Sequence, residues 1–223
     1  MTLEVKSLSF KFAEHCDNLF QNVDLSIYPG QLTIIKGDSG IGKSTLCKIM
    51  CGVVPNVVKG VIQGTVTFQN KSILNMSLIE VSRYLGVVFQ DPDTQLFMPT
   101  VEDEIAFGLE NLAITPYTIS KKIEKVIRNN ELESVIHKNP KLCSGGEKQL
   151  IVFSSVVAMN HPILLLDEAF SQIDTRKCEL IREQLICLKK QGKGILLIDH
   201  QNNYDDIADH MYCLETRKLM KIG

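Results

Sequence analysis

The sequence predicts an α/β fold in which helices cover a largely parallel sheet. The segment GQLTIIKG, residues 30–37, is a short apolar run that ends at a glycine, and KSTLCKIMCGVV, residues 43–54, then has helical spacing up to Pro55. Two later runs, at 163–167 and 195–199, are continuously apolar, which is typical of strands buried on both faces of a parallel sheet.

The remaining elements alternate in the same way. The helix expected at 101–112 repeats apolar residues on one face and has Thr100 as its N-cap. The other predicted elements are strands over 65–68 and 85–89 and helices over 119–130, 145–158 and 174–191. We expect a single domain over residues 1–223, with a core at about 1–90 and 160–223 and an inserted helical subdomain at about 91–159.

Composition excludes several classes of protein. The 223 residues are 44% hydrophobic, which is enough for a full core, and 24 basic against 26 acidic residues give a formal net charge of -2. A dedicated nucleic-acid binder would be more basic, so we expect no nucleic-acid partner. The sequence has no signal-peptide pattern and no apolar run of the ~20 residues that span a bilayer. We therefore expect a cytoplasmic chain that meets a membrane only through a partner.

The cysteines predict neither disulfides nor zinc. Seven cysteines are an odd number, and no two of them form a C-x-x-C pair. Reduced thiols are the simpler interpretation.

The segment GDSGIGKST is the strongest chemical signal, because it fits G-x-x-x-x-G-K-[ST] between a strand and a helix. Its glycines let backbone N–H groups point at phosphate oxygens, and the helix N-terminus adds partial positive charge. Lys43 is expected to reach the β- and γ-phosphates of a nucleotide, and the Ser44 hydroxyl to bind Mg²⁺. The nucleotide-binding residues expected here are Gly37, Asp38, Ser39, Gly40, Ile41, Gly42, Lys43, Ser44 and Thr45.

The segment PILLLDEAF places two carboxylates at the end of a buried strand. Adjacent carboxylates are costly there unless a cation or a water uses them. Asp167 is expected to hold Mg²⁺, and Glu168 to activate the water that attacks the γ-phosphate. An exposed acidic pair that merely ends a strand is the alternative.

The segment LCSGGEKQL places Ser144, Gly145, Gly146 and Glu147 where a helix begins. By itself this pattern is a common helix cap. Between a phosphate loop and an Asp-Glu strand, it predicts a second phosphate-facing helix N-terminus.

In this order the motifs resemble the ATP-binding cassette (ABC) family along essentially the whole chain. The resemblance implies a core of the P-loop NTPase type with an N-terminal antiparallel β subdomain and an inserted α-helical subdomain. It implies that Gln90 contacts nucleotide and metal, that Asp174 belongs to a loop facing a second subunit, and that His200 acts catalytically beside Glu168 and Lys43. Phe12 matches the aromatic residue that stacks on adenine. Phe12 in a core and His200 on a surface remain alternatives.

The same resemblance implies ATP and Mg²⁺ as cofactors and a head-to-tail dimer, in which each ATP lies between the phosphate loop of one subunit and the SGGE segment of the other. The chain departs from the family pattern at Cys143, Glu147, Leu150, Ala169 and Gln201, among others. Because these positions cluster on the face toward the second subunit, a heterodimer is favoured over a homodimer.

The segment FQDPDTQLFMPTVEDEIAFG closely resembles ATPases of energy-coupling factor transporters, which import cobalt and vitamins. In that family this surface receives a helix of the membrane subunit. The resemblance implies a transmembrane coupling subunit docked near residues 90–108, a substrate-binding membrane subunit, and a peripheral location on the cytoplasmic face of the membrane. Exposed Leu96, Phe97 and Met98 would be covered by that partner; packing inside the helical subdomain is the alternative.

Two other functions remain open. One is the ATPase of another type of ABC importer, and the other is a regulatory cassette that senses ATP with weak hydrolysis. Which vitamin, vitamin precursor or transition-metal ion would be imported does not follow from the sequence.

Overall fold

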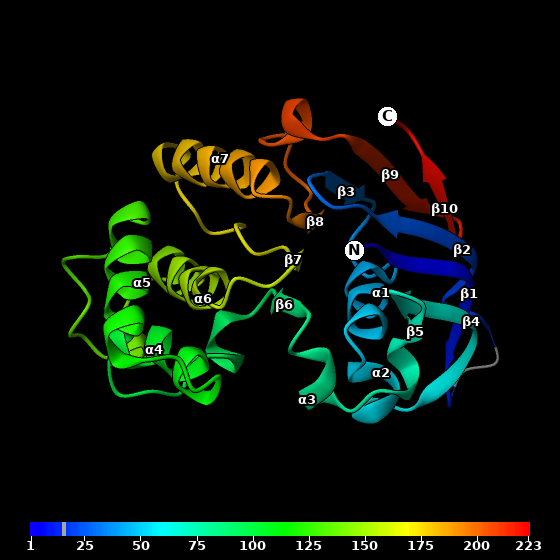
Figure 1. Ribbon diagram of the computed structural model, residues 1–223. Helices are drawn as coiled ribbons and strands as arrows, with labels where there is room; N and C mark the ends of the chain where they lie inside the picture. The colour runs from blue at the N-terminus through cyan, green and yellow to red at the C-terminus, as the bar shows by residue number, and fades with distance from the viewer. Residues whose placement is uncertain (15–16) are drawn as a thin grey trace.

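Two sheets and the helices around them form the molecule (Figure 1). The structure is a computed structural model that describes residues 1–14 and 17–223. The first sheet is antiparallel and has the order β2-β1-β4-β5. Its strands are β1 (Leu3–Phe12), β2 (Phe20–Ile27), β4 (Gly60–Phe68) and β5 (Lys71–Ser72). It is the antiparallel β part that the family resemblance implied.

The second sheet confirms the predicted α/β class. Its order is β10-β9-β3-β8-β7-β6, and all neighbouring pairs are parallel except β9 with β10. The strands are β3 (Leu32–Lys36), β6 (Leu85–Val88), β7 (Ile163–Asp167), β8 (Gly194–Ile198), β9 (His210–Glu215) and β10 (Lys218–Lys221). Every residue of β7 and β8 is buried, which explains their continuous apolar sequences.

Helices pack around this sheet. They are α1 (Lys43–Met50), α2 (Val53–Asn56), α3 (Leu78–Val81), α4 (Val101–Asn111), α5 (Pro116–Asn129), α6 (Gly145–Ala158) and α7 (Thr175–Lys190). Short 3₁₀ turns lie at Ile73–Asn75, Pro92–Thr94, Pro140–Leu142 and Asp205–Ile207. In the described part of the chain, no helix has the length and apolar character needed to cross a bilayer.

The helices α4, α5 and α6 pack on one another and gather on the side of the molecule away from the antiparallel sheet (Figure 1). Helix α6 also packs on β6. The proposed boundary at residue 159 therefore falls just after the helix that joins this group to the sheet. We keep the division into core and helical subdomain as a proposal.

Local rules account for most differences from the predicted boundaries. The first helix ends at Met50 instead of continuing to Val54, because Gly52 adopts a left-handed conformation with φ of 76°. Asp174 caps α7 through its side chain instead of being its first residue. The strand predicted at 65–68 is the end of the longer β4, whose first half contains two glycines and no continuous apolar run.

The loop after β6 corrects one expectation. Leu96 was expected on the surface but is only 3% exposed and belongs to the core around α4 and α6. Phe97 is 59% exposed, and Met98 is partly buried. Leu96 therefore follows the packing alternative, and Phe97 is the apolar side chain of this loop that is left for a partner.

The carboxyl ends of β3, β8, β7 and β6 lie side by side along one edge of the sheet. Ligands of open α/β sheets bind at such an edge. The four predicted motifs that follow these strands, near Gly37, His200, Glu168 and Gln90, are thereby brought together.

Candidate functional site

The phosphate loop begins where β3 ends and leads directly into α1. Gly37, Gly40 and Gly42 all have positive φ, of 139°, 80° and 113°. A Cβ at Gly40 would meet no atom within 4 Å, so the loop faces open space there. The cavity at this point is lined by Phe12, Leu19, Ser39, Gly40, Gly42, Lys43, Ser44, Thr45, Gln90 and Glu168. Ile41 lines an adjoining cavity.

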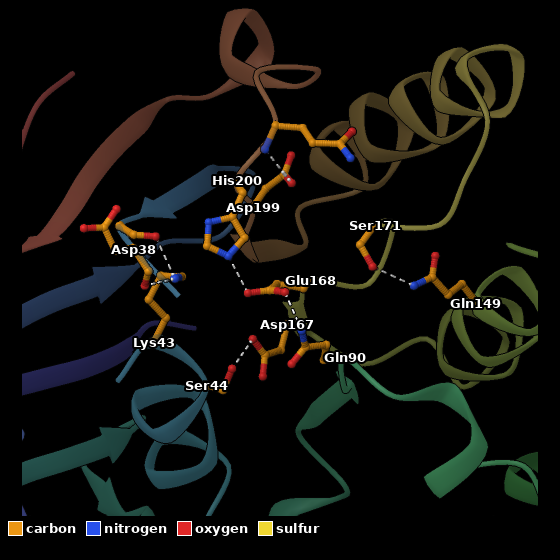
Figure 2. A network of polar contacts seen from close by, with 12 residues as sticks. Asp38, Lys43, Ser44, Gln90, Gln149, Asp167, Glu168, Ser171, Asp199 and His200 are labelled. Atoms are coloured by element: carbon orange, nitrogen blue, oxygen red, sulfur yellow. Dashed lines mark hydrogen bonds and ion pairs between the residues drawn. The ribbon is translucent and has the colours of Figure 1, made fainter. Parts of the chain in front are cut away.

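Lys43 holds the loop in its curved shape. Its Nζ donates hydrogen bonds of 2.8 Å to the backbone carbonyls of Gly37 and of Asp38, and the residue is 3% exposed. Burial lowers the pKa of the Lys43 ammonium, and the nearby Glu168 and Asp167 carboxylates act in the opposite direction. Lys43 thus lines the cavity, and its ammonium lies between the carbonyls of the loop, beside Asp38 (Figure 2).

Ser44, which lines the cavity, forms an oxygen pair with Asp167. The Ser44 hydroxyl donates to Asp167 Oδ1 at 3.0 Å, and Asp167 is 1% exposed. Burial raises the pKa of Asp167, while the hydrogen bond from Ser44 opposes that rise. A hydroxyl and a buried carboxylate are hard oxygen donors of the kind that Mg²⁺ prefers, so the residues present fit this ion.

Glu168 is held between two side chains from the segments that follow β6 and β8. Gln90 Nε2 donates to Glu168 Oε2 at 2.6 Å, and His200 Nε2 lies 2.6 Å from Oε1 (Figure 2). The Glu168 backbone N–H donates to the Ile198 carbonyl, and its φ of 49° is unusual for a residue other than glycine. Such a conformation costs about 1–3 kcal/mol, so the surrounding contacts fix the direction of this carboxylate.

Gln90 lies in the cavity wall, where its amide nitrogen is directed at Glu168. Its predicted contacts with metal and nucleotide stay predictions, since the hydrogen bond that the structure gives it is to the carboxylate. His200 is exposed and stands at the end of β8, as expected, with its ring directed at Glu168 (Figure 2).

Phe12 ends β1 beside the phosphate loop. Its ring packs edge-on against Phe10, with centroids 5.0 Å apart, and it lines the cavity next to Gly40. Phe12 is half-buried. One part of its side chain packs against the core around β1 and β2, and another part forms the wall of the cavity.

The SGGE segment is a fully formed capping box on α6. The Ser144 backbone N–H and hydroxyl both donate to Glu147 Oε2, at 2.7 and 2.8 Å, and Glu147 N–H donates to Ser144 Oγ. These bonds lower the pKa of Glu147. A Cβ at Gly145 or Gly146 would meet Gln172, so the glycines allow the loop after β7 to lie against α6. None of these four residues lines the cavity at the phosphate loop.

Sequence reasoning missed Gln149, which joins α6 to the loop after Glu168. Gln149 is 1% exposed; its Nε2 donates to Ser171 Oγ at 3.1 Å, and its Oε1 accepts from the Gln172 N–H at 3.0 Å (Figure 2). Lys148 makes a second link, an ion pair of 2.7 Å with Asp93 in the loop after Gln90. Gln149 could have been found from its position in the predicted helix, because a polar residue on the buried face of a helix is expected to make hydrogen bonds.

Comparisons with known proteins agree with this geometry. The family model for ABC transporters matches residues 20–171. The energy-coupling factor transporter ATP-binding protein EcfA1 of Mycoplasma pneumoniae is 31% identical over 92% of this chain and 73% of its own length. An ABC transporter ATP-binding protein of Methanosarcina mazei is 31% identical over 99% of this chain, which spans only 45% of that relative.

Solved structures show the same fold. CbiO1 from Clostridium perfringens, described as part of the ABC transporter complex CbiONQ, superposes with a TM-score of 0.82 at 25% identity, over 98% of this chain and 86% of CbiO1. An ATP-binding subunit of an ABC transporter superposes with a TM-score of 0.85 at 20% identity, over 98% and 88% of the two chains. The chain belongs to the ABC transporter family of ATP-binding proteins, whose members are ATPases.

Proposed function

We propose that the chain binds ATP with Mg²⁺ and hydrolyses it to drive a membrane importer of the energy-coupling factor type. The observation that carries the proposal is one cavity lined by Lys43, Ser44, Gln90 and Glu168. Asp167 is bonded to Ser44 behind this lining, and His200 Nε2 lies 2.6 Å from the Glu168 carboxylate. The relationship to EcfA1 and CbiO1 supports the transporter type.

Each of these residues has a distinct task in the proposed reaction. The backbone of the phosphate loop and the Lys43 ammonium hold the phosphates, and Ser44 and Asp167 hold Mg²⁺, which supplies charge neutralisation to the phosphate oxygens. Glu168 accepts a proton from the attacking water at its carboxylate. The Gln90 amide orients that carboxylate, and His200 stabilises the negative charge that develops beside it.

The SGGE segment serves a second cassette in this proposal. Ser144 and its neighbours do not line the chain's own cavity. We propose that the N-terminus of α6 receives the phosphates of an ATP bound by another subunit, with the capping bonds of Ser144 and Glu147 exchanged or supplemented on binding. We propose a dimer, with a different ATPase subunit preferred to a second copy. If the purified chain alone formed an ATP-dependent homodimer that is fully active in ATP hydrolysis, the reason for preferring a different subunit would be removed.

The membrane partner is proposed to dock on Phe97 and Phe107. These rings pack edge to face with centroids 5.0 Å apart and remain 59% and 38% exposed. Two side chains support this surface. Glu104 Oε2 accepts from the backbone N–H groups of Phe97 and Met98, while Gln95 Nε2 donates to the Val87 carbonyl in β6 and its Oε1 accepts from the Phe89 N–H just after that strand. A rigid apolar pair suits a helix of a membrane subunit.

Affinity purification from the native membrane tests this proposal. The tagged chain, solubilised in mild detergent, is expected to retain a polytopic coupling subunit and a small substrate-binding subunit, and the identity of the small subunit would name the vitamin or metal ion. Phe97→Ser should lose these partners while keeping ATP binding. Tyr117→Ser, which alters a 74% exposed ring on α5, is the matched control. Recovery of soluble partners alone would reject transport and favour a regulatory cassette.

A further inference from the structure

A second cavity adjoins the one at the phosphate loop and has Arg217 in its wall. It is lined by Phe12, Asp17, Asn18, Leu19, Gly40, Ile41 and Arg217. Phe12, Leu19 and Gly40 line both cavities. A ligand whose phosphates lie at Lys43 therefore has room to extend past Phe12 toward Arg217.

Arg217 lies in a turn whose backbone conformation is unfavourable for residues other than Asn and Gly. Thr216 and Arg217 form the turn between β9 and β10 with φ of 45° and 66°, conformations that hairpin turns usually assign to Asn and Gly. The Arg217 carbonyl accepts a hydrogen bond of 2.8 Å from the Gln21 N–H, which anchors the turn to the start of β2.

The guanidinium is also held in direction. Arg217 Nη2 lies 3.0 Å from Asp17 Oδ2, in a pair whose side chains are 49% and 77% exposed. Such an exposed ion pair adds at most about 1 kcal/mol of stability. Its more specific effect is to orient the guanidinium at the cavity wall and to offset its charge.

The chemistry of the wall fits an uncharged heteroaromatic ring better than another phosphate. The Asp17 carboxylate cancels the charge of Arg217, whereas a phosphate site would leave that charge unpaired. A planar guanidinium stacks on aromatic rings, as does Phe12, and the Asn18 amide offers both a donor and an acceptor to ring nitrogens and amino groups. Among the described residues, the Asn18 side chain has no hydrogen-bond partner of its own.

We propose that Arg217, oriented by Asp17, is a nucleobase-contacting residue, so that the turn between β9 and β10 forms the outer wall of the nucleoside site. This inference rests on the proposed ATP binding and adds a specificity residue from the far end of the chain. The guanidinium contacts the base, and the phosphates remain with the loop at residues 37–45.

Binding of two ligands separates the base from the phosphates. Affinities for ATP and for inorganic tripolyphosphate, both with Mg²⁺, would be measured by calorimetry for the wild type, Arg217→Ala and Arg217→Lys. Arg217→Ala is expected to weaken ATP binding about three- to fivefold, the effect of losing one cation–π contact, and to leave tripolyphosphate binding unchanged. Arg217→Lys, which keeps the charge without the planar group, should recover little of the loss.

Arg128→Ala is the matched control, since it removes an arginine from an exposed ion pair, with Glu124 on α5, far along the chain from the cavity. Equal losses for both ligands in Arg217→Ala, or full recovery in Arg217→Lys, would show a charge contact with phosphate and overturn the proposal. Unchanged ATP affinity in Arg217→Ala would mean that Arg217 only stabilises the turn between β9 and β10, and would overturn the proposal. A wild type that binds neither ligand would instead reject the proposed function itself.

Discussion

The phosphate-loop half of the site and the SGGE half are built in opposite ways. Around Lys43 and Glu168, side chains at or just after the carboxyl ends of β3, β6, β7 and β8 bond one another and the backbone of the phosphate loop. At Ser144 and Glu147, the polar groups bond within a single turn of α6 and line no part of the cavity at the phosphate loop. The first half is organised by tertiary structure, and the second by local helix capping.

This difference indicates where each half obtains its ligand. A preorganised cavity binds phosphates and metal without a partner, because its donors are already fixed. A helix N-terminus with an internal carboxylate must exchange or supplement its own contacts before it binds another anion. The phosphate-loop half is thus expected to determine affinity and chemistry, and the SGGE half to determine association with a second cassette.

The largest expected effect is on the chemical step. Glu168→Gln keeps the size of the side chain and removes the proton acceptor, so hydrolysis should fall by about 10²- to 10⁴-fold while ATP binding persists. Phosphate release in a single turnover measures it. Glu179→Gln, on the exposed side of α7, is the control. Undiminished turnover would remove Glu168 as the base.

Lys43→Ala should weaken ATP binding about 10- to 100-fold, because charge-assisted hydrogen bonds to the phosphates are lost. The variant also loses the hydrogen bonds from Lys43 Nζ to the Gly37 and Asp38 carbonyls, which hold the loop in shape. Equilibrium binding of a fluorescent ATP analogue measures this. Lys48→Ala changes a lysine in the last turn of the same helix and controls for loss of helix stability. Equal affinity in the Lys43 variant would contradict the phosphate-loop assignment.

Gln149→Met tests the link between the two halves. The variant leaves the Gln172 N–H without its partner, so the free energy of unfolding should fall by about 1–3 kcal/mol. If the Gln149 contacts also couple the SGGE segment to the nucleotide site, ATP-dependent association with the second cassette should weaken while ATP affinity stays unchanged. Gln191→Met, at the exposed end of α7, is the comparison. Loss of stability alone would limit Gln149 to packing.

Glu147→Gln should strengthen ATP-dependent association with the second cassette about two- to fivefold, because it removes a negative charge from the N-terminus of α6. Glu80 provides a matched control, since it closes an equivalent capping box with Ser77 on α3. Glu80→Gln should leave association unchanged. A similar gain in both variants would indicate a general effect of charge.

The smallest expected effect is on acid stability. Hydrogen bonds from Ser144 lower the pKa of Glu147 in the folded chain. Its stabilisation is therefore present above the ordinary glutamate pKa of 4.5 and is lost as the pH falls through the folded value. The wild type should lose more stability than Glu147→Gln between about pH 5 and pH 3, as measured by chemical unfolding. Parallel pH profiles would contradict the capping role of the carboxylate.

The sequence by itself determined the local chemistry of this protein. Glycine spacing before Lys43, the apolar run before Asp167 and the cap at Ser144 depend on neighbours in the chain, and α6 was predicted to the residue over Gly145–Ala158. The antiparallel strands β1 and β2 were expected only through the family resemblance, because a strand with one exposed face has a weaker pattern than a buried one.

Only the tertiary structure decided which distant residues meet. Gln90 and His200 contact Glu168 across 78 and 32 positions of sequence, because β6, β7 and β8 are parallel neighbours whose carboxyl ends meet at one edge of the sheet. Arg217 reaches Asp17 across 200 positions. Leu96 and Phe97 are equally apolar in sequence, yet one is buried and the other exposed. Burial and contact arise from the neighbours that packing supplies, and a local pattern does not contain them.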